Sequence, residues 1–236
     1  MSKKIFLVGL LISICAVLGL AQDEKKAVFE DAKLPKTAGS AEKFAAPGWV
    51  IEEMISGDLN NDNVADVAVV FIEKPKANAD KDAQDSRERV LMVLFKNQKG
   101  DFERIATAQE LLPCTQCGGM LGGNSSAADI KIIKGVLIVN SLSGSRESTE
   151  TTFRFRYNPK AARLALIGFD MVESDRGTGS STRTSTNYLT RLQITEEYQY
   201  NNKLDKDVKK STKQTRVTKP TKYIEDVDYG AMMGGN

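Results

Sequence analysis

The stretch GDLNNDNVADVAVVF, from Gly57 to Phe71, joins an oxygen-rich loop directly to an apolar run. Its loop positions one, three, five, seven and nine can each present an oxygen ligand: Asp58, Asn60, Asp62, the backbone carbonyl of Val64, and Asp66. Calcium prefers six to eight oxygens at about 2.3–2.6 Å, and alternate positions on a tight loop can surround the ion. We therefore predict a calcium site here, with a bare Asx-rich turn as the alternative.

The loop differs from an EF-hand, because Val69 holds the twelfth position, where an EF-hand keeps a bidentate glutamate. Asn63 holds the sixth position, where a left-handed turn is expected, and asparagine tolerates positive φ better than most residues. The ligands end at Asp66 and a strand begins at once. Five inward oxygens would leave little room for a substrate, so we expect a structural metal rather than a catalytic one.

Short alternating runs separated by turn signals predict an all-β fold. The run 64–73 is apolar enough for burial on both faces, and Lys134-Gly135 predicts a two-residue hairpin turn. Two successive four-stranded antiparallel meanders resemble propeller blades, so we expect an incomplete propeller-like arrangement or a sandwich. The expected strands cover 49–56, 64–73, 89–97 and 102–108, then 128–134, 136–142, 151–158 and 164–172, with one more over 186–201.

The first 21 residues predict a secretory signal peptide. Lys3 and Lys4 precede a short apolar run, and the small residues Gly19 and Ala21 stand before a polar segment, so cleavage is expected after Ala21. The alternative is an uncleaved anchor, but a spanning helix needs about 20 apolar residues. We therefore expect an exported protein, periplasmic or secreted, with no transmembrane span after cleavage.

Composition divides the rest of the chain into three parts. Residues 22–48 form a polar N-terminal lead, residues 49–200 form the all-β domain, and residues 201–236 form a tail that is first basic and then acidic. We expect the tail to be a solvated edge strand or disordered. The alternative is that the basic segment 203–222 contacts anionic surfaces of the cell envelope.

Charge and residue usage exclude several functions. The formal net charge is +2, and signal cleavage removes two lysines, so the mature chain has no strong positive field to attract nucleic acid. The chain contains no histidine. Ser-His-Asp triads, Cys-His pairs and histidine-ligated metal sites are therefore excluded. Acid–base catalysis would depend on carboxylates, lysine or tyrosine.

Two cysteines, Cys114 and Cys117, remain after cleavage removes Cys15. An even pair in an exported chain predicts a structural disulfide. Two alternatives stay open. One is a thioredoxin-type redox pair, which needs a helix start within a βαβ unit, and the other is a zinc site shared across a dimer.

Several segments resemble one protein family in order: Trp49, GDLNNDNVADVAVVF, CTQCGG, IKIIKGVLIV, SGSRE, TFRFRY and LALIGFD. Together they are similar to small exported bacterial proteins of unknown function that carry one FG-GAP or VCBS-like calcium loop and a C-x-x-C-G-G element. The similarity spans roughly residues 49–192. It implies a β fold with a calcium loop at a turn into a strand, and it implies no known reaction.

No motif assigns a catalytic residue, so we predict a non-enzymatic, calcium-stabilised binding or structural protein with an unknown envelope or extracellular partner. The alternative is a carboxylate-dependent hydrolase acting on glycans. Such an enzyme needs two carboxylates about 5–9.5 Å apart in a cleft. The candidates outside the loop are Asp129, Glu147, Asp170 and Asp175.

Overall fold

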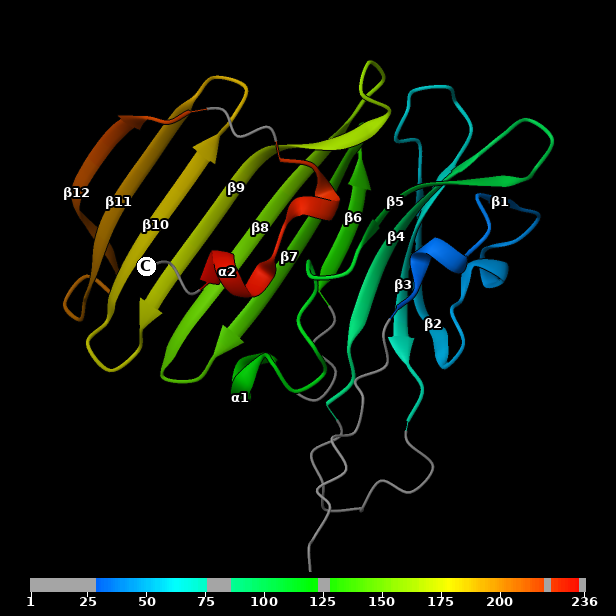
Figure 1. The fold of residues 1–236 in the computed structure, drawn as a ribbon. Helices are drawn as coiled ribbons and strands as arrows, with labels where there is room; N and C mark the ends of the chain where they lie inside the picture. The colour runs from blue at the N-terminus through cyan, green and yellow to red at the C-terminus, as the bar shows by residue number, and fades with distance from the viewer. Residues whose placement is uncertain (1–28, 76–85, 123–127, 219–221, 234–236) are drawn as a thin grey trace, which may run out of the picture.

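The computed structural model describes residues 29–75, 86–122, 128–218 and 222–233, so the predicted signal peptide lies outside the described residues. The chain forms two antiparallel sheets (Figure 1), which confirms the all-β prediction. The strands are β1 (Thr37–Ala38), β2 (Trp49–Gly57), β3 (Asp66–Glu73), β4 (Arg89–Lys96), β5 (Phe102–Ala108), β6 (Asp129–Ile133), β7 (Val136–Gly144), β8 (Glu147–Asn158), β9 (Arg163–Asp175), β10 (Ser180–Asn187), β11 (Leu192–Asn201) and β12 (Lys206–Arg216).

The strands are distributed as five and seven rather than as the two four-stranded meanders expected. The five-stranded sheet has the order β1-β5-β4-β3-β2, and the seven-stranded sheet has the order β12-β11-β10-β9-β8-β7-β6. Neither sheet closes on itself within the described residues. The two sheets pack against each other at one end, so the arrangement is sandwich-like.

Helical segments are short and lie outside the sheets. They are the 3-10 turns η1 (Asp31–Lys33), η2 (Ala41–Phe44) and η3 (Ile224–Asp226), and the helices α1 (Gly119–Gly122) and α2 (Tyr229–Met233). Within the ranges that the structure describes, no helix has the length and apolar character to cross a membrane.

The larger hydrophobic cluster lies between the two sheets. It joins Val70 of β3 and Leu91 of β4 to Phe153 of β8 and Leu166 of β9, all almost fully buried. Phe153 also packs on Phe169, with ring centroids 4.8 Å apart. Burying one such side chain stabilises the fold by about 1.5–3 kcal/mol. This cluster explains why residues 151–158 alternate between apolar and polar side chains.

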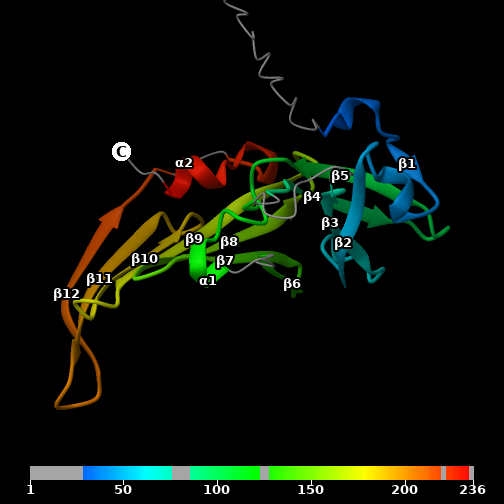
Figure 2. The ribbon, with the colours of Figure 1, turned by 90° about the horizontal axis from the view of Figure 1, so that it is seen from below.

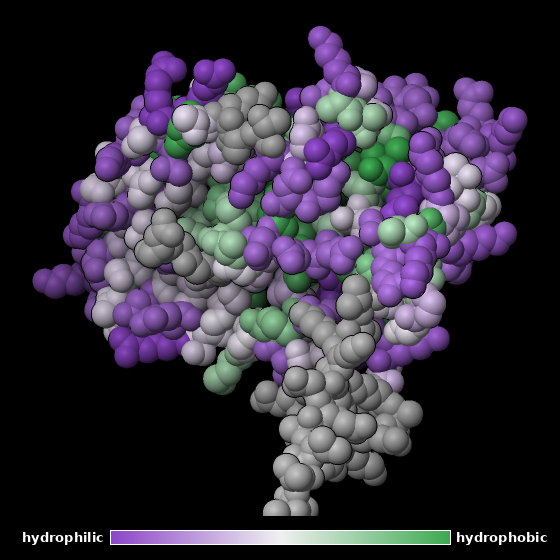
Figure 3. Space-filling view, viewed as in Figure 1, coloured by the Kyte–Doolittle hydropathy of each residue, from purple (hydrophilic) through white to green (hydrophobic). Residues whose placement is uncertain are grey.

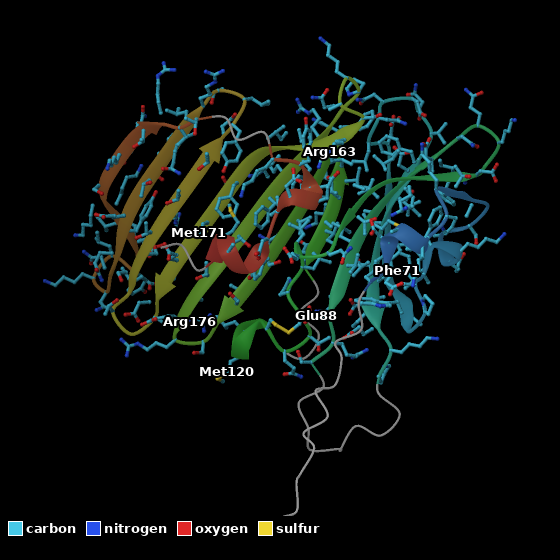
Figure 4. All side chains as sticks on the ribbon, viewed as in Figure 1. Phe71, Glu88, Met120, Arg163, Met171 and Arg176 are labelled. Atoms are coloured by element: carbon cyan, nitrogen blue, oxygen red, sulfur yellow. A yellow bond between two sulfur atoms is a disulfide. The ribbon has the colours of Figure 1, made fainter. Side chains whose placement is uncertain are left out.

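A second cluster covers the opposite face of the five-stranded sheet. Phe29 packs edge-on against Trp49, with centroids 5.0 Å apart, and lies 5.7 Å from the ring of Phe71. Figure 4 shows Phe71 in the sheet next to the N-terminal segment. Val69 and Phe71 therefore face this cluster while Val70 faces the other. Burial on both faces explains the nearly continuous apolar sequences of β3 and β4.

The predicted N-terminal lead therefore joins the fold from residue 29. Phe29 and Phe44 are buried, although the N-terminal lead as a whole is polar. Two aromatic side chains suffice to anchor this segment, because each buries a large apolar area.

The last three strands extend beyond the region where the sheets pack together. We call residues 180–216, which contain β10, β11 and β12, the wing. No residue of β11 or β12 belongs to either hydrophobic cluster. Figure 2 shows these strands at the end of the sheet farthest from the five-stranded sheet, and Figure 3 shows pale to hydrophilic side chains over them.

After the wing, the chain returns to β9. The N–H of Leu166 donates to the carbonyl of Lys222 at 3.0 Å. The guanidinium of Arg163 lies 3.8 Å from the centre of the Tyr223 ring, and the same arginine pairs with Glu225 at 2.7 Å. Figure 4 shows Arg163 beside this returning segment. Ile224 is fully buried in the larger cluster. Both ends of the wing are therefore attached to the same strand.

Candidate functional site

The loop between β2 and β3 is closed by hydrogen bonds from its own backbone. The carboxylate of Asp58 accepts the N–H groups of Asn61 at 2.6 Å and Asn63 at 3.0 Å, and Asp62 accepts the N–H of Val64 at 2.8 Å. Asn61 and Asn63 have φ of 64° and 65°. The left-handed conformation expected at Asn63 is therefore confirmed, and asparagine accommodates it at little cost.

Asp66 fastens this loop to the five-stranded sheet. It is the first residue of β3 and is completely buried. One of its oxygens accepts the N–H of Leu59 at 2.9 Å, and the other accepts the N–H of Lys96 at 3.1 Å. Burial raises the pKa of Asp66, the two N–H donors oppose that shift, and the negative charges of Asp62 and Asp58 add to it.

The oxygen chemistry of the loop suits a hard cation, and a bound ion would offset the charge of the buried Asp66. However, no three Asp, Glu or Cys side chains in the described ranges converge as a metal group requires. The oxygens of Asp58, Asn60, Asp62 and Asp66 all accept backbone N–H groups. The conformation described here is thus that of an Asx-rich turn, and calcium binding stays a prediction.

The predicted pair of cysteines is joined. The sulfur atoms of Cys114 and Cys117 are bonded, and their Cα atoms lie 5.0 Å apart. The pair lies after β5 and before α1, where the chain crosses from one sheet to the other. Cys114 is buried, and the N–H of Cys117 donates to its carbonyl at 3.1 Å. The bond therefore fixes the local turn at this crossing.

An ion pair between a buried arginine and a partly exposed glutamate, near this crossing, was not predicted from the sequence. Arg89, at the start of β4, has only 1% of its side chain exposed and makes two hydrogen bonds to Glu52, at 2.6 and 2.9 Å. It also donates to the carbonyl of Pro113 at 3.2 Å, next to the disulfide. The pairing of β2 with β3 shifts between Ile51 and Glu53, so Glu52 is the extra residue of a β-bulge. Two consecutive glutamates between apolar residues of one strand are the sequence signal for it.

The acids proposed for hydrolysis are divided between different surfaces. Asp129 pairs with Lys131 on β6, and Asp170 pairs with Arg154 at 2.6 Å. Glu147 and Asp175 face each other across β8 and β9. These last two, with Glu173 and neighbouring serines and threonines, line a shallow hollow of about 320 Å³.

The chemistry of that hollow is limited by an ion pair. Arg146 contacts Asp175 at 3.1 Å, and the side-chain hydrogen bond from this arginine is the main reason that the pKa of Asp175 falls to about 2. A second hydrogen bond comes from the N–H of Gly177 at 2.7 Å. Asp175 is therefore ionised near neutral pH and cannot donate a proton there.

The charged side chains of the wing form ion pairs between its strands. Arg183 pairs with Asp207 at 2.9 Å and stacks over Tyr198, while Lys209 pairs with Glu196. β12 carries five basic side chains and one acidic one. In the described part of the chain, three of its exposed lysines make no ion pair: Lys206, Lys210 and Lys213.

In comparisons with known proteins, the chain matches no protein-family model, no curated protein and no solved structure.

Proposed function

We propose that the chain is an exported, non-enzymatic binding domain that uses the wing to contact an anionic surface and is stabilised by calcium at its Asx-rich loop. The observation that carries the proposal is the wing itself. Three strands contribute almost nothing to the interior, yet cross-strand pairs order their charged side chains. Strands that bury no hydrophobic core of their own leave their side chains available for contacts with a partner.

The positive charge of β12 favours an anionic partner. Its lysines lie on an edge strand that is exposed along most of its length. Basic residues near an anionic membrane or polymer each contribute about 1 kcal/mol to binding, and the attraction is lost over one Debye length. The expected partner therefore carries repeated phosphate groups, in a lipid headgroup or in a soluble polymer.

We expect a triple variant, Lys206→Gln with Lys210→Gln and Lys213→Gln, to weaken binding to anionic phosphatidylglycerol vesicles by roughly 100-fold at low salt. Co-sedimentation measures the loss, and soluble polyphosphate in a parallel arm distinguishes a polymer from a membrane. Lys43, Lys99 and Lys160 are exposed on other surfaces, so their triple glutamine variant removes the same charge and should keep the affinity. Equal weakening in both variants would show that only net charge matters and would contradict a site on the wing.

Calcium is expected to stabilise the fold through Asp58, Asn60, Asp62, Val64 and Asp66. A ligand that binds only the native state adds about 2.7 kcal/mol at a hundredfold excess over its Kd. Thermal melts in millimolar calcium should show a higher midpoint than melts in chelator, and Asp62→Ala should abolish the difference. The same midpoint in calcium and in chelator would leave the loop as a metal-free polar turn.

The hollow lined by Glu147, Glu173 and Asp175 favours glycan hydrolysis as a second candidate. With Asp175 held ionised by Arg146, the proton donor would have to be Glu147 or Glu173. Turnover of a glycan that is lost in Glu173→Gln and retained in Asp170→Asn, on the other side of the sheet, would favour this candidate over the first.

A further inference from the structure

The four outer strands of the two sheets differ in how they are protected against pairing. β1 has only two residues, and β12 is rich in lysine. β6 lies against the end of β2, where a Cβ on Gly57 would come within 2.5 Å of the Cγ2 of Ile132. The first half of β2 has neither lysine nor proline, and its protection consists of the bulge at Glu52 and the charge of Glu53. It still leaves Val50 and Met54 exposed, at 37% and 51%. An exposed apolar edge of this kind is a template for another strand.

A groove of about 440 Å³ follows this part of β2. It is lined by Glu42 of η2, by Ala45 directly after η2, and by β2 from Trp49 to Met54. The bulge turns Glu52 toward Arg89 and leaves the neighbouring Glu53 exposed. In the described ranges β2 pairs only with β3, so its outer edge forms no β-ladder. The N–H of Trp49 already donates to the carbonyl of Ala46 at 3.0 Å, so the free part of this edge begins after Trp49.

The charge of the groove distinguishes between possible occupants. Its side chains are apolar or acidic, and among the described residues Glu42 and Glu53 make no ion pair. A second copy, paired antiparallel through the same stretch, would bring another two carboxylates beside Glu52 and Glu53, and like charges across a pair of strands are destabilising. A basic partner gains from the same charges.

We propose that the outer edge of β2 between Trp49 and Met54 binds an extended peptide segment of another protein, with alternating apolar and basic side chains, by strand addition. The backbone of the segment pairs with β2 and supplies affinity. Its apolar side chains cover Ile51 and Met54, which share one face of β2, and its basic side chains approach Glu53 on the opposite face. This site is separate from the wing and from the calcium loop, so its failure would leave the proposed function intact.

The test uses the folded chain and a fluorescent nine-residue peptide in which lysine and valine alternate. Anisotropy measures binding, and the emission of Trp49 gives a local signal, because it is the only tryptophan in the chain and lines the groove. We expect at least roughly tenfold weaker binding for a glutamate–valine peptide and for a lysine–valine peptide methylated at alternate backbone nitrogens. The methylated peptide keeps its side chains and loses the hydrogen bonds that strand addition requires.

Met54→Lys is expected to weaken binding of the lysine–valine peptide at least roughly tenfold, because it places a charge on the strand edge. Leu189→Lys is the matched control, since Leu189 is 52% exposed in the turn between β10 and β11 and the variant should bind as the parent does. Melting curves check that both variants fold. The proposal is overturned by absence of binding, by equal binding of the acidic or methylated peptide, or by equal loss in both variants. A dimer that Met54→Lys dissociates would also overturn it, in favour of a second copy on β2.

Discussion

Glu52→Ala is expected to lower the free energy of unfolding by about 1.5–3 kcal/mol, because the buried guanidinium of Arg89 loses the carboxylate that accepts two of its hydrogen bonds. The side chain of Arg89 is 1% exposed. Urea denaturation followed by circular dichroism measures the change. Glu53→Ala is the matched control: the neighbouring glutamate is exposed, so its removal should alter stability by no more than about 0.5 kcal/mol.

A double variant tests how much of this loss comes from leaving the charge of Arg89 buried in the absence of Glu52, as opposed to losing a favourable ion pair. An uncharged pair, Glu52→Leu with Arg89→Met, should recover most of the loss, because removing both charges relieves the desolvation penalty. If Glu52→Ala and Glu53→Ala have the same small effect, Arg89 is satisfied without Glu52 and the pair does not hold the bulge in place.

Asp66→Ala is expected to cost about 2–6 kcal/mol in chelator, where no metal contributes. Two backbone N–H groups, those of Leu59 and Lys96, lose their acceptor, and each unsatisfied donor costs about 1–3 kcal/mol. Asp66→Asn keeps one acceptor oxygen and should lie between the parent and the alanine variant. Chemical denaturation provides the measurement.

Asp62→Ala is the control within the same loop. Asp62 is exposed and accepts one backbone N–H, so in chelator its loss should cost about 1 kcal/mol or less. A comparable loss from both variants in chelator would mean that the whole loop, and not Asp66 alone, anchors β3 to β4.

The strands with a buried face could be predicted from the sequence. The run 64–73 predicted burial on both faces, and the two clusters confirm it. In the expected strand over 151–158, Phe153 and Phe155 alternate with Arg154 and Arg156, and both phenylalanines are fully buried. The turn at Lys134-Gly135 is confirmed by positive φ at both residues, 51° and 72°.

The wing could not be predicted in the same way. The sequence predicts no strand over residues 173–185, but they complete β9 and begin β10. Residues 206–216 lie in the predicted tail and form the exposed edge strand β12, which confirms the first of the two expectations for this segment. Serine, threonine and lysine dominate these strands, so hydrophobic periodicity gives no signal where no core is buried. The expected single strand over 186–201 is instead the end of β10, a turn, and β11.

The site was predictable in composition but not in arrangement. The alternate spacing of the loop oxygens is visible in the sequence, but it could not show that both oxygens of Asp66 accept N–H groups, from Leu59 in the loop and Lys96 in β4. Glu52 and Arg89 are 37 positions apart, and only the packing of β2 beside β3 and β4 brings them together. Pairs between distant positions depend on tertiary structure and leave no local pattern.

The chain leaves β9 to form the wing and then returns to pair with β9 again, so both ends of the wing are held by the same strand. Ala165 pairs with Tyr223, and Ile224 re-enters the interior directly after it. Because the outer strands bury so little, their length and charge can change through mutation while the interior keeps the same residues. Substitutions in β11 and β12 are therefore expected to change the surface charge with little effect on stability, because neither strand contributes a residue to the hydrophobic clusters.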